Sequence, residues 1–207
     1  MDTLAVQAEK DWEGFKKRYI SSPILSKEWD LVTDELFWGC YGLQVFNDDF
    51  CEQFIKAADD CGDWFQGIRY DTVPGPDLLL EHFGFNDFYN RILRELIYPI
   101  IIHKYHLESI MNKVTDDEKF HAKNFAIKYT PETQSHLSMH HDFSGITVLL
   151  TLNDAYEGGG TWFFDQQKLV KSKPGYMAIH PGMFTHYHGA RPVTKGSRYV
   201  VLSFNNW

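Results

Sequence analysis

The sequence predicts an α+β fold in which helices cover one face of a β-sandwich or barrel. Helical signals dominate the first half of the 207 residues, whereas short runs of β-branched and aromatic residues, separated by turn signals, recur in the second half. Apolar residues make up 43% of the chain and charged residues 23%, the balance of a globular protein with a sizeable core. We expect residues 1–207 to form a single domain, with about residues 1–35 as a helical N-terminal extension.

Periodicity and capping residues predict two helices in the N-terminal part. Residues 1–19 have the pattern of one amphipathic helix. Asn47 and Asp48 can cap a second helix through 49–61, because their side chains can accept from free backbone N–H groups. Gly62 then supplies a natural end for that helix.

A third helix and a series of strands follow a Pro/Gly loop at 71–78. The helix begins near Asp87, and Pro99 should kink or end it. Strands are expected at 124–129, 145–152, 161–164, 176–180, 184–188 and 197–204.

The charge balance and the N-terminus exclude several classes of protein. The net charge of −8 argues against broad nucleic-acid binding and would suit a cationic substrate. No stretch approaches the about 20 apolar residues of a membrane span, and no signal peptide is recognisable. We expect the chain to start in the cytosol, or to be a domain excised from a larger and possibly ER-lumenal protein. Cys40, Cys51 and Cys61 are expected to be reduced, with a Cys51–Cys61 bridge as the alternative.

The candidate chemistry begins at His140-His141-Asp142. Alternate side chains of an extended chain point the same way, so His140 and Asp142 should share a face while His141 points away. An imidazole and a carboxylate at this spacing can bind one metal ion together.

A second pair of imidazoles occurs at His186-Tyr187-His188. Either His186 or His188 could complete a facial triad of two histidines and one carboxylate. Such a triad occupies three positions of an octahedral Fe(II) and leaves the others open for substrate and oxygen.

Two further polar residues point to an organic cosubstrate. Arg198 stands in a strand of otherwise uncharged residues, and a buried arginine needs an anion, which its bidentate fork matches as a carboxylate. Tyr129 ends the strand before the His-His-Asp motif and could donate to another carboxylate oxygen. A dianion that chelates metal at one end and keeps one carboxylate free would fit all of these residues, and 2-oxoglutarate is that molecule.

Each feature alone also has an ordinary structural explanation. A single His-x-Asp is a common chance match among ten histidines, and His-Tyr-His could be a surface strand or an adventitious nickel or zinc site. An arginine at the start of a strand is usually solvated or paired with an acid. What favours the metal site is the order of Tyr129, His140-x-Asp142, Gly158–Gly160, His188 and Arg198.

With these residues identified, the chain resembles the Fe(II)/2-oxoglutarate-dependent dioxygenase domain of the procollagen lysyl hydroxylases. The similar stretches are KYTPETQSHLSMHHDFSGITV, LNDAYEGGG and HPGMFTHYHGARPVTKGSRYVVLSF, of which the last is the most specific. Weaker similarity extends upstream through DELFWGCYGLQVFNDDFCEQFI and VPGPDLLL. The resemblance implies a double-stranded β-helix, or jelly roll, with supporting N-terminal helices. It also implies iron ligands at His140, Asp142 and His188, and so selects His188 over His186.

The remaining site residues follow from the same resemblance. It implies that Arg198 and Tyr129 bind 2-oxoglutarate and that Thr147 lines the site. Two departures from the family stand out: Leu149 replaces a common asparagine, and Phe184 replaces a leucine that supports dimerisation in the family. Phe184 is still apolar, so a homodimer is expected.

The implied activity is hydroxylation of peptidyl lysine at C5, in a peptide that could be collagen-like. Succinate and CO2 would be co-products, O2 the second substrate, and ascorbate (vitamin C) a further cofactor. One alternative is a prolyl or other amino-acid hydroxylase of the same superfamily. The other is a non-catalytic, metal-binding jelly-roll interaction domain.

Overall fold

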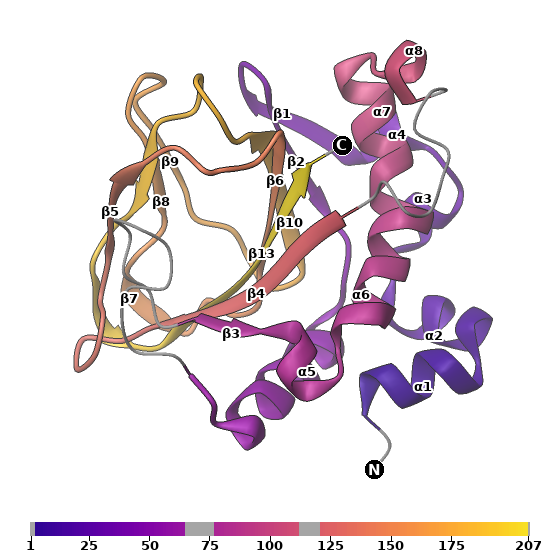
Figure 1. The fold of residues 1–207 in the computed structure, drawn as a ribbon, viewed down its shortest axis with the longest axis horizontal. Helices are drawn as coiled ribbons and strands as arrows, with labels where there is room; N and C mark the ends of the chain where they lie inside the picture. Colours follow the sequence, from indigo (N-terminus) through magenta and orange to yellow (C-terminus); the bar gives the residue numbers. More distant parts are fainter. Residues whose placement is uncertain (1–2, 65–76, 112–120, 207) are drawn as a thin grey trace.

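Two antiparallel β-sheets face each other in the computed structural model, which describes residues 3–64, 77–111 and 121–206 (Figure 1). The large sheet has the order β1 (Thr33–Phe37), β2 (Cys40–Gln44), β10 (Tyr176–Pro181), β6 (Ile146–Thr151), β13 (Arg198–Asn206), β4 (His121–Tyr129) and β3 (Asp77–Leu79). The small sheet has the order β5 (Leu137–His140), β11 (His188–Ala190), β8 (Thr161–Phe163) and β9 (Lys168–Val170). A separate ribbon pairs β12 (Val193–Gly196) with β7 (Tyr156–Gly158).

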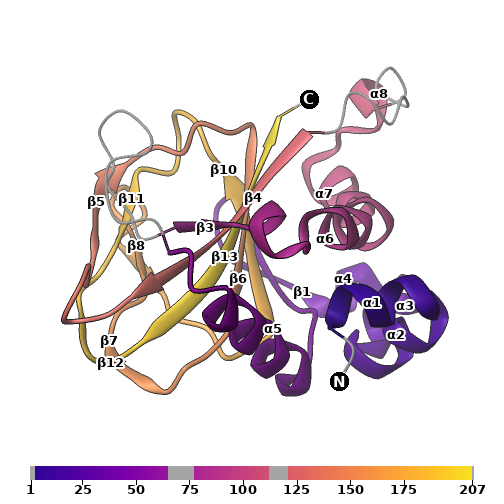
Figure 2. The ribbon, with the colours of Figure 1, turned by 60° about the horizontal axis from the view of Figure 1, so that its bottom comes forward.

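Helices cover the outer face of the large sheet (Figure 2). They are α1 (Leu4–Lys10), α2 (Trp12–Tyr19), α3 (Ser22–Leu25), α4 (Trp29–Val32), α5 (Asp48–Cys61), α6 (Asn86–Ile92), α7 (Tyr98–Tyr105) and α8 (Glu108–Met111), with a 3-10 turn at Leu80–Phe83 and a π-helical turn at Leu93–Ile97. The predicted arrangement of helices on one face of a sandwich is therefore confirmed.

Strand alternation separates two apolar cores. On β13, Tyr199 and Val201 pack among the helices, whereas Val200 and Leu202 point between the two sheets. Because Arg198 is in phase with Val200, its side chain also enters the space between the sheets. The candidate site residues are thus carried by the inner faces of the sandwich.

One helix prediction needs correction. The expected helix at 1–19 is broken at Asp11, whose side chain accepts from the Gly14 N–H at 2.9 Å and so caps a new helix. The third helix is interrupted next to Pro99, as predicted: α6 gives way to the π-helical turn, and Pro99 lies in the first turn of α7, where its missing N–H is not needed. The predicted α5 is also confirmed.

Five of the six predicted strands are found, and one is wrong. Residues 183–185 form a bend, residues 186–187 have no regular structure, and β11 begins only at His188. Phe184 has φ +74°, which is incompatible with a strand. The predicted loop at 71–78 lies mostly outside the described residues, and its last two positions open β3. The sequence did not reveal the short strands β5, β7, β9 and β12, because each has too few residues to show alternation.

The structure shows the state of the three cysteines and the length of the apolar helices. All three cysteines are free, and burial raises the pKa of the Cys40 and Cys51 thiols to about 12. Among the described residues, no helix is long and apolar enough to span a bilayer.

Candidate metal and cosubstrate site

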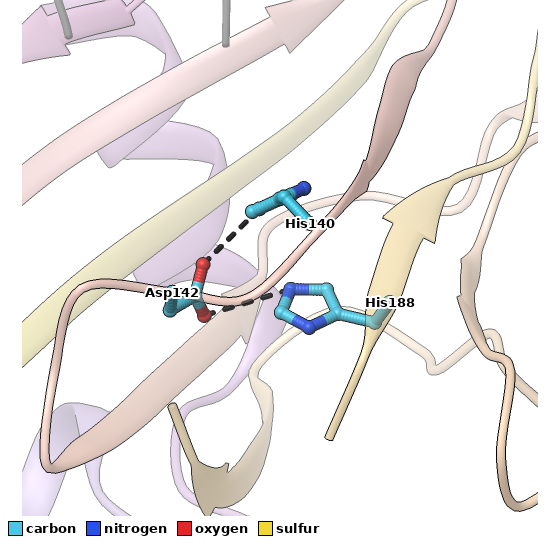
Figure 3. Close-up of side chains that lie close together, drawn as sticks. All are labelled: His140, Asp142 and His188. Carbon is cyan, nitrogen blue, oxygen red and sulfur yellow. Dashed lines mark hydrogen bonds and ion pairs between the residues drawn. The ribbon is translucent and has the colours of Figure 1, made fainter. Parts of the chain in front are cut away.

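His140, Asp142 and His188 lie together between the sheets (Figure 3). His140 ends β5 and is the Cα partner of His188 at the start of β11, while Asp142 follows two residues after His140. Asp142 Oδ1 is 3.2 Å from His140 Nε2, and Oδ2 is 3.5 Å from His188 Nε2. One ligand atom from each residue falls within 4.8 Å of the other two, the spacing of a site that could hold a metal ion.

Backbone carbonyls set the tautomer of both imidazoles. His140 Nδ1 lies 2.8 Å from the Ser138 carbonyl, and His188 Nδ1 lies 2.8 Å from the His186 carbonyl. A carbonyl only accepts, so each Nδ1 carries a proton, and in the neutral ring the Nε2 atom then keeps its lone pair for a metal. Both lone pairs belong to the nitrogens that face Asp142. Burial also lowers the pKa of His188, which favours the neutral ring that a metal requires.

Asp142 is held as a charged, oriented carboxylate. It is only 2% exposed, and burial by itself would raise its pKa, but His188 and His140 together keep that pKa far below its ordinary value. The Thr147 hydroxyl donates to Asp142 Oδ2 at 2.7 Å, and the Ser144 hydroxyl lies 2.7 Å from Thr147. Thr147 therefore orients the carboxylate, and a direct contact of Thr147 with a cosubstrate stays a prediction.

The other histidine of the His-Tyr-His motif has a different set of contacts. His186 Nε2 donates to the Trp38 carbonyl at 3.2 Å, and Nδ1 accepts from the Thr185 hydroxyl at 2.9 Å. Both ring nitrogens are thus occupied away from Asp142. Of the two candidates that spacing left open, the structure brings only His188 to the cluster.

Arg198 and Tyr129 meet at the other end of the space between the sheets. They are Cα partners across β13 and β4, and the guanidinium lies 5.5 Å from the centroid of the tyrosine ring. Arg198 is 3% exposed, and its Nη2 donates to the Thr161 hydroxyl at 3.0 Å. No carboxylate of the described residues forms an ion pair with it, which leaves a buried cation without an anion.

Two buried polar atoms at this end have no hydrogen-bond partner among the described residues. They are Nε of Arg198 and the hydroxyl of Tyr156. Sequence reasoning missed Tyr156 and Thr161, although Tyr156 stands two residues before the three glycines. A Cβ on Gly159 would come within 2.6 Å of the Tyr156 ring, and Gly159 has φ +65°, so glycine allows this ring to pack beside Arg198.

The separation of the two ends follows from strand register. Thr161, which holds Arg198, lies two residues before Phe163 on β8, and Phe163 is the Cα partner of His188. Two strand residues correspond to about 7 Å. Tyr129 interacts electrostatically with both ends. Burial raises the pKa of its phenol to about 12, while the Arg198 cation acts to lower this pKa and the Asp142 carboxylate acts to raise it. Its phenol therefore stays protonated and able to donate.

The inner surface between the two ends is apolar. Leu149, Val200 and Leu202 are buried there in one cluster with Tyr129 and Tyr156. Leu149 thus occupies the wall of the site, where the predicted departure from asparagine removes a polar group.

Comparison with known proteins shows which family this part of the chain resembles. Residues 118–206, which contain His140, Asp142, His188, Arg198 and Tyr129, match the family described as the 2OG-Fe(II) oxygenase superfamily. This part of the chain is therefore similar to that superfamily.

Within it, the chain is similar to the procollagen lysyl hydroxylases, which confirms the predicted resemblance. It is 29% identical over 181 residues to multifunctional procollagen lysine hydroxylase and glycosyltransferase LH3 of Rattus norvegicus, covering 79% of this chain and 23% of that protein. It is 27% identical over 208 residues to procollagen-lysine,2-oxoglutarate 5-dioxygenase 1 of Gallus gallus, covering 93% of this chain and 27% of that protein. The chain thus spans about a quarter of the length of these curated relatives.

Solved structures confirm the jelly-roll fold. A prolyl-4-hydroxylase of Pseudomonas putida aligns with a TM-score of 0.60 at 12% identity, covering 88% of this chain and 98% of that one. A viral collagen prolyl hydroxylase from Paramecium Bursaria Chlorella virus-1 aligns with a TM-score of 0.52 at 18% identity, covering 77% and 90%. At these identities the similarity concerns the fold.

Proposed function

We propose that the chain is an Fe(II)- and 2-oxoglutarate-dependent hydroxylase that acts on peptidyl lysine at C5 and releases succinate and CO2. One relationship carries the proposal: a cluster of two imidazoles and one carboxylate lies about 7 Å along the strands from a buried arginine that has no anion. The similarity to procollagen lysyl hydroxylases supports lysine as the substrate residue.

The donor set fits iron. His140 and His188 each offer an Nε2 lone pair fixed by a hydrogen bond at Nδ1, and Asp142 offers a charged oxygen fixed by Thr147. Two imidazoles and one carboxylate on one side of a metal are the ligands of non-haem Fe(II) oxygenases. These three residues would hold the ion.

The opposite end fits the free carboxylate of 2-oxoglutarate. A carboxylate there would neutralise Arg198 and could accept from its unpaired Nε and from the Tyr156 hydroxyl. Tyr129 adds a third donor, because its phenol remains protonated. The distance between the two ends suits a five-carbon dicarboxylate whose other end reaches the metal.

The residues of the chain then have separate tasks. When bound, the iron supplies the activation of O2, which no side chain can perform. Arg198 and Tyr129 fix the cosubstrate, and Thr147 fixes the ligand carboxylate. Leu149, Val200 and Leu202 exclude water from the reacting centre. Ascorbate would serve as the external reductant that keeps the iron divalent.

A homodimer is part of the proposal. Phe143 and Phe184 are each 84% exposed, and the Met183 N–H donates to the Ser144 carbonyl at 3.1 Å, so their loops run side by side. Two neighbouring exposed phenylalanines are a surface that a second copy could cover.

Mass spectrometry of peptide products tests the substrate assignment. Short peptides with lysine or proline at one position would be incubated with the protein, Fe(II), 2-oxoglutarate and ascorbate. We expect the mass of one oxygen atom to be added at lysine. Addition only at proline would replace the lysyl assignment by the prolyl alternative. Absence of any addition and of any succinate would favour the non-catalytic domain.

A further inference from the structure

A stack of three rings leads from the metal cluster to the protein surface. The ring centroids of His180 and His186 are 5.7 Å apart at 24°, and those of His186 and Trp38 are 5.9 Å apart at 13°. His180 in turn lies 5.0 Å from the ring of His188. With the hydrogen bond from His186 to the Trp38 carbonyl, this stack fixes the tip of the β1–β2 hairpin beside the site.

Trp38 presents a free face at the end of this stack. It is 69% exposed although one side of the indole packs on His186. The close approach depends on Gly39, which has φ +70° and whose Cβ, if present, would lie 3.3 Å from His186 Cε1. A large aromatic ring that is both exposed and rigidly supported is typical of a recognition surface.

Two carboxylates lie on the segments that meet at this end of the ring stack. Glu35 Oε1 accepts from the Gly39 N–H at 3.4 Å, at the same hairpin tip. Asp165 lies on the turn after β8, within electrostatic reach of His186, and the next residue, Gln166, donates to the Thr185 carbonyl at 3.1 Å. Both carboxylates are exposed, and no described residue forms an ion pair with either. The surface therefore combines an aromatic face with unpaired negative charge.

We propose that Trp38, Glu35 and Asp165 form a docking site for a basic residue of the peptide substrate, lysine or arginine, that flanks the target lysine. A cation over an indole face is attracted by the ring, and the nearby carboxylates add charge complementarity. The proposal rests on the proposed function, because a peptide must approach this end of the sandwich for its lysine to reach the metal.

The distance excludes the target lysine itself as the occupant. Three successive ring contacts of 5.0, 5.7 and 5.9 Å separate His188 from Trp38, whereas the oxidised carbon must lie at the metal. An extended peptide advances about 3.3 Å per residue, so the docked cation would stand a few residues from the target.

Binding of two matched peptides tests this site without turnover. A fluorescent peptide with one central lysine would carry arginine in its flanks, and its partner would carry citrulline, which keeps the shape of arginine but lacks its charge. Fluorescence anisotropy would give both dissociation constants on protein loaded with Mn(II) and 2-oxoglutarate. We expect the wild-type protein to bind the arginine peptide about five- to tenfold more tightly.

Variants test whether the preference for the arginine peptide comes from Trp38, Glu35 and Asp165. Trp38→Ala and the double variant E35Q/D165N should each bring the arginine peptide to the affinity of the citrulline peptide. Leu31→Ala, at another exposed apolar residue, and E9Q/E52Q, with the same change in net charge on the helical side, should keep the preference. Thermal unfolding would confirm that each variant is folded.

Three results would overturn the proposal. They are equal binding of both peptides by the wild-type protein, a preference that survives Trp38→Ala and E35Q/D165N, and a change of oligomeric state in Trp38→Ala that shows this face to be covered by a second copy. A preference of the expected kind without any hydroxylated lysine would support the docking site and contradict the proposed function instead.

Discussion

His140 and His188 are direct Cα partners across β5 and β11, so one antiparallel register presents both imidazoles to the same carboxylate. A shift of that register by one residue would turn either ring to the opposite face of the small sheet. Their Nδ1 hydrogen bonds to the Ser138 and His186 carbonyls complete the orientation. The site therefore depends on the pairing of two very short strands.

Replacing each histidine of the His-Tyr-His motif should affect a different property: metal affinity for His188 and stability for His186. His188→Ala removes a proposed ligand, and we expect metal affinity to fall by more than about a hundredfold, beyond the usual effect of an outer-shell change. His186→Ala should keep metal binding but lower the free energy of unfolding by about 1–3 kcal/mol, because the hairpin loses its hydrogen bond and stacking partner. Titration with Mn(II) and thermal unfolding measure the two effects. Loss of metal binding in His186→Ala alone would reverse the assignment.

Thr147→Val should weaken metal binding without breaking the fold. Valine keeps the shape of threonine but cannot donate to Asp142 Oδ2. The loss of such an outer-shell hydrogen bond is expected to reduce metal affinity by about 10- to 100-fold. Calorimetric titration with Mn(II) would measure this change, and Thr151→Val, on the same strand, is the matched control. Unchanged affinity would mean that Thr147 does not orient the ligand carboxylate.

Arg198→Ala should raise the KM for 2-oxoglutarate by about 10- to 100-fold, the effect of losing a hydrogen-bonded charge. Tyr156→Phe should raise it less, because it removes one neutral donor. Neither substitution touches the metal cluster, so Mn(II) affinity in the absence of 2-oxoglutarate should be retained. An unchanged KM in Arg198→Ala would show that the buried guanidinium does not bind the cosubstrate.

Phe184→Asp should convert the proposed homodimer into a monomer. A charge at this exposed position cannot be buried against a second copy without a partner. Light scattering at micromolar concentration would give the mass of the wild-type protein and the variant, with Leu31→Asp as the control. A monomeric wild-type protein would contradict the proposed homodimer.

The sequence predicted the fold class and most residues of the site. It could not predict the backbone of the 184–187 segment or the contacts that Tyr156 and Thr161 make. The long strands at 124–129 and 197–204 were readable because five or more alternating residues face two apolar cores. The irregular backbone at 184–187 could not be predicted, because aromatic residues at alternate positions resemble a strand until the left-handed backbone of Phe184 is seen. Tyr156 and Thr161 were missed since no local motif marks a side chain that lies near Arg198, about 40 residues away in the sequence.

Succinate release tests the central claim most directly. The wild-type protein, given 2-oxoglutarate, O2 and a lysine-containing peptide, should produce succinate only when Fe(II) is present. Asp142→Ala, assayed in parallel, should produce none, because the oriented carboxylate of the cluster is gone. Succinate formed by the wild-type protein without iron, or formed equally by Asp142→Ala, would contradict the assignment of this cluster as the metal site of an oxygenase.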